Sequence, residues 1–397
     1  MLKKKNRLIS YVLKRYIKNT IIIVVITVSI IIAIEVILRI IFFEKVEKAY
    51  KFDSDYLISL KPNQSKVFQR SIENGNDVIF WKTNKDSFRG EELRNNPNYR
   101  VLVIGDSNIQ ARFSKLENTF TKQLEKYLLK DIEDVEVINA GIVGAGPDQS
   151  LIRFKKLAPM LKPNLVIFHV FCDNDFGDIL RNNLVEINLN GGVSKTKYKR
   201  YKSKKLKLLN NILVMRALNK ISLKVFQEKF DVENIDYVNK FYQQTQKEYL
   251  NYKQGKSGDH FYDYYDIDIS IMPNIQSSKL KIKLMDAILK EANQFAKDTK
   301  IKFVILIQPS KVDLVDDLPF SYKDLQKYPG YKQSNQTQFL QTICESSNID
   351  FINLFNVFFH NNPQYLFFSK NDSHWNDFGQ KLAAEKVAEY IVKKYKL

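Results

Sequence analysis

Five short apolar runs recur along this chain, and most of them are followed by a segment with helical spacing. Runs of this length, rich in Val, Ile and Phe, are typical of strands that are buried on both faces of a parallel sheet. The predicted strands are Val101–Ile104, Val135–Asn139, Leu165–Phe171, Ile301–Ile307 and Ile349–Leu354. Their alternation with helices predicts a three-layer α/β/α sandwich around a five-stranded parallel sheet.

The predicted helices are Glu117–Lys130, Gln149–Leu161, Ser278–Thr299, Thr337–Ser347 and a last one through Lys381–Ile391. The β-α rhythm stops after the third strand and returns about a hundred residues later. We therefore expect an insertion at about 176–275, with helical stretches at Leu206–Phe230 and Val238–Tyr252. The remainder of 99–397 forms the α/β domain.

The strand Val101–Ile104 is followed at once by Gly105, Asp106 and Ser107. Gly105 lets the backbone turn sharply, and ligands of open α/β sheets bind just beyond the carboxyl ends of the strands. Ser107 is therefore a candidate nucleophile. These three residues alone also fit an ordinary turn whose serine caps a helix, so the assignment depends on other motifs.

Polar segments also follow the second and third strands. The glycine-rich loop from Ala140 to Pro147 contains Gly144 and precedes a helix, and such a loop can bind an anion through backbone N–H groups. Its spacing fits neither the dinucleotide fingerprint nor the phosphate-binding loop of nucleotide hydrolases. Asn174 follows the third strand, where its side chain either donates into a cleft or forms a turn.

The amino-terminal region predicts a membrane anchor. Residues 1–19 form a tail with seven basic residues and no acidic one, and the apolar segment Thr20–Phe43 follows. A helix of that length crosses a bilayer core of about 30 Å. No small-x-small cleavage site follows it, so we expect an uncleaved single-pass anchor rather than a signal peptide. The basic tail predicts a cytoplasmic amino terminus and an extracytoplasmic catalytic domain.

The formal net charge of +18 arises partly in the tail and partly between Lys195 and Lys229. The basic run Lys195–Lys205 by itself suggests a nucleic-acid patch, but the predicted topology places it outside the cytoplasm, so we expect no nucleic-acid partner. Two other interpretations of this run remain: a lid that contacts an anionic lipid or polysaccharide, and a merely solvated loop.

Residues 44–98 are interpreted as a stalk and packing segment, with an edge strand at Val78–Trp81.

The motifs around Ser107, Gly144 and Asn174 are followed, late in the chain, by Asp372-x-His374. In this order they resemble the four motif blocks of the SGNH/GDSL hydrolase superfamily, and the anchor resembles its single-pass, membrane-anchored members. The resemblance covers about Asn84 to the carboxyl terminus, apart from the insertion. It implies a flavodoxin-like α/β/α fold.

The resemblance also implies roles for individual residues. Ser107 would be the nucleophile, His374 its general base and then acid, and Asp372 the carboxylate that orients His374. The oxyanion hole would consist of the backbone N–H groups of Ser107 and Gly144 and the side-chain amide of Asn174. Asp106 and Asp175 would hold the turns that orient Ser107 and Asn174.

The sequence departs from the family pattern in two places. Cys172 stands where the third block usually begins with glycine, and the carboxylate Asp372 lies two residues before His374 rather than three. Anchored members that modify exopolysaccharides share the shorter spacing and the following Trp375. Of the other histidines, His169 is expected to pack in the core, and His260 and His360 to be exposed. No pair has metal-ligand spacing, so neither metal nor cofactor is expected.

The leading hypothesis is a serine esterase that acts outside the cytoplasmic membrane through an acyl-serine intermediate. Its substrate would be an acylated glycan, a lipid or a small ester. The alternatives are an O-acyltransferase that modifies a cell-envelope polysaccharide, with a membrane-bound acyltransferase as partner, and a non-catalytic subunit of a polysaccharide-modification complex. The motifs do not tell whether water or a sugar hydroxyl accepts the acyl group.

Overall fold

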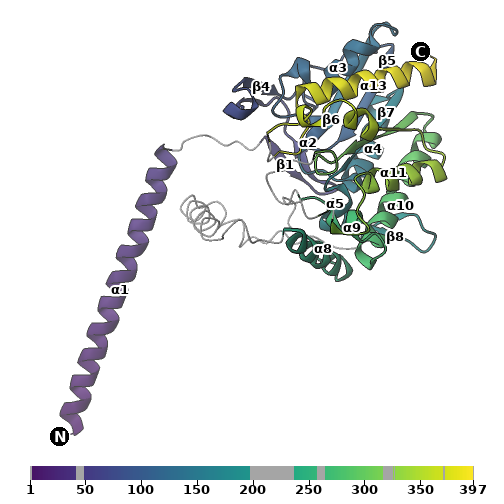
Figure 1. The fold of residues 1–397 in the computed structure, drawn as a ribbon. Coiled ribbons are helices and arrows are strands. Elements are labelled where there is room, and N and C mark those ends of the chain that lie inside the picture. Colours follow the sequence, from purple (N-terminus) through teal and green to yellow (C-terminus); the bar gives the residue numbers. More distant parts are fainter. Residues whose placement is uncertain are drawn as a thin grey trace. The chain divides into compact units, whose positions relative to one another are not determined.

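The computed structural model describes residues 2–41, 49–196, 237–256, 264–315, 325, 327–369 and 372–396. The chain divides into two units, one with helix α1 (Leu2–Ile41) and one with the α/β domain, and each is described by itself (Figure 1). The predicted helix Leu206–Phe230, His260 and most of the basic run Lys195–Lys205 lie outside the described residues.

Helix α1 contains the apolar amino-terminal segment. Its stretch Lys14–Glu35 is 22 residues long, with a mean hydropathy of 2.5. This length and composition fit either a membrane anchor or a signal sequence. The stretch overlaps the predicted span Thr20–Phe43, of which residues 42 and 43 lie outside the described part of the chain.

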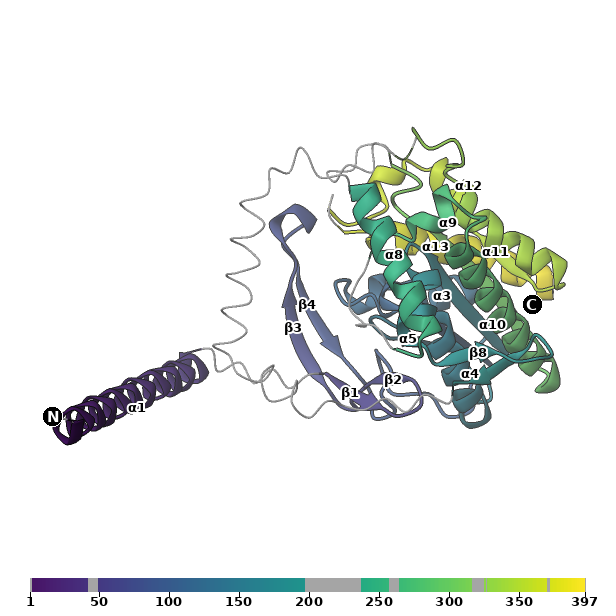
Figure 2. The same ribbon diagram turned by 90° about the horizontal axis from the view of Figure 1, so that it is seen from below.

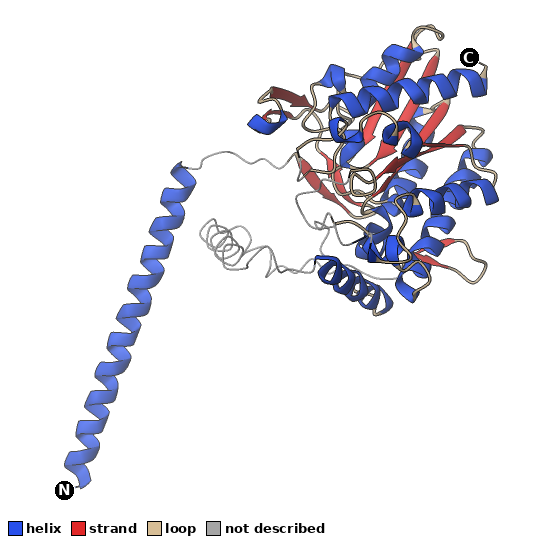
Figure 3. Cartoon of the chain, viewed as in Figure 1, coloured by secondary structure: helices blue, strands red, loops and turns tan. Residues whose placement is uncertain are grey.

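The α/β domain is built on a five-stranded parallel sheet, drawn in red in Figure 3. The strands in spatial order are β11 (Phe351–Asn353), β10 (Lys302–Pro309), β7 (Leu165–Cys172), β5 (Tyr99–Gly105) and β6 (Val135–Gly141). The register pairs Gly105 with Gly141 and Pro309 with Cys172, so neighbouring strands end at the same edge. The predicted fold class and all five predicted strands are confirmed.

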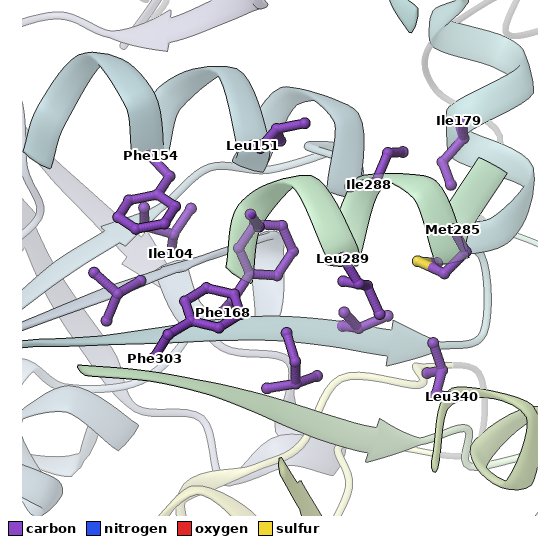
Figure 4. Close-up of a cluster of buried hydrophobic side chains, with 14 of the residues drawn as sticks. Ile104, Leu151, Phe154, Phe168, Ile179, Met285, Ile288, Leu289, Phe303 and Leu340 are labelled. Atoms are coloured by element: carbon purple, nitrogen blue, oxygen red, sulfur yellow. The ribbon is translucent and has the colours of Figure 1, made fainter. Parts of the chain in front are cut away.

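Helices cover both faces of this sheet, which gives the predicted three layers. Alternate residues of β5 point to opposite faces, so Leu102 and Ile104 enter one apolar cluster and Val101 and Val103 the other. The first cluster packs under α4 (Pro147–Leu161), α5 (Asp175–Asn182), α10 (Gln276–Asp298) and α11 (Asn335–Ser346), as Figure 4 shows for Leu151, Ile179, Ile288 and Leu340. The second packs under α3 (Phe120–Leu128), α12 (Phe355–Phe359) and α13 (Asp377–Tyr395).

Some elements differ from the expectation. Helix α5 lies where the pattern indicated an insertion, and its signal was the apolar triplet Phe176, Ile179 and Leu180, whose side chains are all buried. The predicted helix Glu117–Lys130 is interrupted because Thr119 caps α3, its hydroxyl accepting a hydrogen bond from the Lys122 N–H. The predicted stretch Val238–Tyr252 is helix α8 (Tyr237–Lys253).

The segment before the first sheet strand forms two small antiparallel pairs. Strand β1 (Tyr50–Asp53) pairs with β2 (Leu57–Leu60), and β3 (Ser65–Gln69) pairs with β4 (Val78–Lys82). The predicted strand Val78–Trp81 is thus β4, but it belongs to a separate ribbon rather than to the parallel sheet (Figure 2). Within the insertion, β8 (Val185–Ile187) pairs with β9 (Val193–Lys195), and the short α9 (Ile267–Ile271) precedes α10.

Candidate active site

Ser107 begins the short helix α2 (Ser107–Gln110), directly after β5. A side chain at Gly105 would meet Ile109 at 2.7 Å and His169 at 2.9 Å, so only glycine fits between strand and helix. Asp106 caps α2, and its carboxylate accepts hydrogen bonds from the Asn108 N–H (2.9 Å) and side-chain amide (3.1 Å). This turn presents Ser107 at the carboxyl edge of the sheet.

Ser107, His374 and Asp372 form a hydrogen-bonded chain in the structure. Nε2 of His374 lies 2.7 Å from Oγ of Ser107, and Nδ1 lies 2.6 Å from Oδ1 of Asp372. The same carboxylate oxygen accepts the His374 backbone N–H at 2.9 Å. The structure thus brings together the three residues predicted for catalysis, although Ser107 and His374 are 267 positions apart.

The environment of Asp372 favours its charged form. Burial would raise the pKa of Asp372, but the hydrogen bonds and charge of His374 and the charge of Lys311 outweigh it, so this pKa lies below its usual value. An ionised Asp372 accepts the Nδ1–H of His374. Nε2 is then left to accept the hydroxyl proton of Ser107, which is the arrangement a general base needs.

A small pocket of about 100 Å³ opens beside Ser107 and His374. Apart from these two residues, its lining is mostly apolar and aromatic: Asn108, Ala111, Arg112, Phe113, Val143, Phe368 and Trp375. A pocket of this kind suits a short uncharged group held next to the serine hydroxyl.

The walls of this pocket are held by the segment interpreted from the sequence as stalk and packing. Nε of Arg70 donates to the Phe113 carbonyl at 2.5 Å, and its Nη2 pairs with Asp377 at 2.7 Å. The side-chain oxygen of Asn74 accepts the Ser369 N–H at 2.7 Å. The turn between β3 and β4 therefore contacts the lining residue Phe113 and Ser369, the neighbour of the lining residue Phe368, a role that the sequence did not indicate.

Gly144 and Asn174, the residues predicted for the oxyanion hole, follow the strands on either side of β5. Gly144 has a left-handed φ of +67° in the turn after β6, and its neighbour Val143 lines the pocket. Asn174 is buried and precedes α5, where its amide donates to Asp178 at 3.3 Å. In the described part of the chain neither Gly144 nor Asn174 lines the pocket itself.

Two buried ionisable side chains, Arg181 and Asp175, hold the Asn174 turn. Arg181 donates to the Asn174 carbonyl at 3.0 Å and pairs with Asp178 at 2.6 Å. Asp175 accepts the Phe171 N–H at 2.7 Å, which agrees with the expected turn-holding role. Burial, aided by the charges of Asp106 and Asp178, raises the pKa of Asp175 well above its usual value.

A buried polar network under Ser107 was not found from the sequence. His169 is packed in the core as predicted, but its Nε2 also donates to the Gln308 side chain at 2.8 Å, and Gln308 in turn donates to Asn108 at 3.1 Å. Burial lowers the pKa of His169, so its ring stays neutral. The sequence feature that could have indicated this network is Gln308, a polar residue near the end of the apolar strand β10. A buried amide needs hydrogen-bond partners, so its neighbours had to be polar too.

Trp375 links this network to the loop that carries His374. Its indole N–H donates to the Asn108 carbonyl at 3.0 Å, and its ring stacks on Phe120 with centroids 5.5 Å apart. Cys172 lies at the end of β7, fully buried in the apolar core. Among the described residues, no cluster of His, Cys, Asp and Glu is arranged to hold a metal ion.

Residues 272–397 match a family model described as "SGNH hydrolase-like domain, acetyltransferase AlgX". The matched segment includes Asp372 and His374 but begins well after Ser107. No curated protein matches the chain in sequence.

Several solved structures resemble the chain at low identity. A lipase/acylhydrolase from Enterococcus faecalis is 12% identical, with a TM-score of 0.38 over 75% of this chain and 96% of its own. An acetylxylan esterase, Axe2 from Geobacillus stearothermophilus, is 11% identical, with a TM-score of 0.38 over 77% and 97%. The esterase EstA from Pseudoalteromonas sp. is 13% identical, with a TM-score of 0.37 over 75% and 99%.

Proposed function

Because the chain has an SGNH hydrolase-like fold, we propose that it is an O-acetyltransferase that acts on a polysaccharide hydroxyl through an acetyl-serine intermediate. The observation that carries this proposal is the 2.7 Å contact between Ser107 Oγ and His374 Nε2, with Asp372 on the other ring nitrogen. Transfer to a sugar, the alternative in the sequence analysis, is favoured over hydrolysis by the acetyltransferase description of the matching family.

In the first half-reaction, His374 Nε2 takes the proton of the Ser107 hydroxyl as Oγ attacks the carbonyl carbon of the donor ester. The resulting tetrahedral intermediate places its negative charge on the former carbonyl oxygen. It collapses as the bond to the donor oxygen breaks, and the imidazolium returns the proton to that oxygen. Asp372 holds the ring in place and stabilises its charged form.

In the second half-reaction, His374 deprotonates a sugar hydroxyl, which attacks the acetyl-serine. The acetyl carbon forms a bond to the sugar oxygen, the bond to Ser107 Oγ breaks, and the proton returns to Oγ through His374. In both steps the oxyanion would be stabilised by the N–H groups of Ser107 and Gly144 and the amide of Asn174. The pocket beside Ser107 is small and mostly apolar, which supports a short acyl group.

The experiment that tests transfer uses the full chain in detergent, 4-nitrophenyl acetate as donor and a neutral oligosaccharide as acceptor. We expect the oligosaccharide to gain an acetyl group, detected by mass spectrometry, and the release of free acetate to fall as the acceptor concentration rises. Both follow because the sugar and water compete for one acetyl-serine.

Ser107→Ala is the matched control and should show neither product. Release of acetate with no acetylated sugar at any acceptor concentration would establish the esterase instead. Consumption of the donor at the same rate by the protein and by Ser107→Ala would leave the non-catalytic subunit as the better interpretation.

We further propose that α1 is an uncleaved anchor with a cytoplasmic amino terminus. The basic tail before the apolar stretch supports this orientation. A periplasmic-type alkaline phosphatase reporter fused after Leu397 should be active, and the protein should stay in the membrane fraction at full length. An active cytoplasmic reporter, or release of a shortened soluble protein, would contradict the assignment.

In that position the enzyme could receive its acetyl group from a membrane-bound acyltransferase partner and pass it to an extracytoplasmic polysaccharide. The acyl donor would then never need to leave the membrane surface.

A further inference from the structure

Backbone carbonyls next to the catalytic Asp372 and His374 bind the side chain of a buried lysine. Nζ of Lys311 donates to the backbone carbonyls of Phe368 (2.9 Å), Ser369 (2.7 Å) and Asp372 (3.0 Å). An ammonium group has three N–H donors, so this one has a partner for each. Lys311 is only 5% exposed, which means that these carbonyls replace the water it would bind in solution.

The two ends of the loop that carries Asp372 and His374 contact each other, and these functional residues lie between them. Phe367 pairs with Trp375, and the Phe368 N–H donates to the His374 carbonyl at 3.0 Å. The carbonyls that Lys311 binds therefore belong to the loop itself. A cation that binds three carbonyl oxygens fixes the backbone at those three residues, and with it the direction of the Asp372 and His374 side chains.

Lys311 is itself held firmly by the turn after β10. The Ser310 hydroxyl donates to Asp173 at 2.5 Å and accepts the Val312 N–H at 3.0 Å. Asp173 directly precedes Asn174. The turn after β10 thus contacts the turn that carries Asn174, the proposed oxyanion donor. Through Lys311 it also contacts the backbone next to His374, the proposed general base.

We propose that Lys311 is a positioning residue, whose ammonium group holds the backbone at Phe368, Ser369 and Asp372 so that His374 reaches Ser107. This inference rests on the proposed function, because it concerns the same serine–histidine pair. Nothing in the chemistry of acyl transfer requires a lysine here. The contacts assign it a role because a misplacement of about 1 Å in a catalytic group costs roughly 10²-fold in rate.

The charge of Lys311 should be visible in the pH dependence. Burial lowers the pKa of Lys311 to about 8, and the charge of Asp372 opposes this only in part. Asp372 is the ionisable group that acts on Lys311 within the described residues, and the ring of Phe367 lies 5.9 Å from its ammonium. Above about pH 8 the neutral amine holds the carbonyls less strongly, so the reactivity of Ser107 should fall.

The test measures how fast a fluorophosphonate probe labels Ser107 in the full-length protein. This readout depends on activation by His374 and not on whether the acetyl group goes to water or sugar. We expect Lys311→Met, which keeps the apolar stem without the charge, to be labelled roughly 10–100-fold more slowly. Lys311→Arg, which keeps a cation at all accessible pH values, should regain much of the rate.

The pH profile separates positioning from general damage to the fold. The loss of labelling above about pH 8 in the natural protein should be absent from both Lys311→Met and Lys311→Arg. Lys302→Met is the matched control, because Lys302 lies at the start of β10, the strand that Lys311 follows, over the rings of Tyr99 and Tyr395. It should label at the natural rate with the natural pH profile.

The outcomes are distinct. If the natural protein is not labelled at Ser107, the proposed function fails and this inference fails with it. If the natural protein is labelled but Lys311→Met is labelled at the same rate, only the inference is overturned. If Lys311→Met and Lys311→Arg are equally slow and both keep the natural loss above about pH 8, Lys311 is only a packing residue and the inference is likewise overturned.

Discussion

Ser107→Ala and His374→Ala should each abolish nearly all acetyl transfer, and the double variant should be hardly slower than either. The physical reason is that His374 acts only through Ser107, so the second loss removes nothing that the first has left. In a comparable serine–histidine unit each single loss costs on the order of 10⁶-fold in turnover. Asp372→Ala should cost less, because Asp372 orients the ring but does not attack. Initial rates with 4-nitrophenyl acetate measure all four variants.

The unfolding temperature of each variant is the control that the fold is intact. Ser107 and His374 are half-buried at the pocket, so neither alanine should change the unfolding temperature by more than a few degrees. Additive losses in the double variant would mean that the two residues work separately. The acetyl-serine mechanism would then have to be abandoned despite their 2.7 Å contact.

Asn174→Ala should lower turnover by roughly 10²–10³-fold, the loss seen when one oxyanion donor is removed from an acyl-transfer enzyme. Because such a donor acts mainly on the transition state, KM should change little. The rates are measured with the same donor at saturating concentration.

Asn182→Ala is the matched control for this variant. Asn182 lies at the other end of α5, buried, with its amide bonded to Asp148 (2.9 Å) and Gln149 (2.7 Å). Its loss should lower thermal stability at least as much as Asn174→Ala but leave turnover nearly unchanged. Equal turnover in the two variants would show that Asn174 is only a turn residue, whose amide serves to bond Asp178.

The residues that sequence reasoning could place are those whose signal is local. A run such as Val101–Ile104 is apolar at every position, so the strand, its burial and the turn after it could be predicted without knowing its neighbours. His374 and Asp372 were placed by their order relative to Ser107 within a family pattern. The geometry that joins them could be expected only because parallel strands end at one edge.

The residues that sequence reasoning missed act across long separations. Lys311 contacts Phe368, 57 positions away, and Asn74 contacts Ser369, 295 positions away. A lysine after a strand and an asparagine in a polar turn are ordinary surface residues by composition. Only the fold shows that Asn74 supports a wall of the pocket and that Lys311 supports the catalytic histidine beside it. No local pattern distinguishes a buried ammonium from an exposed one.

The separation between Ser107 and His374 has a consequence in time. A ribosome adds about 5–20 residues per second, so the 267 positions between them correspond to roughly 13–53 s of synthesis. During that interval a chain that already carries the serine lacks the histidine that would activate it. The nucleophile is therefore made long before it can react, and every truncated product that ends before His374 remains chemically silent.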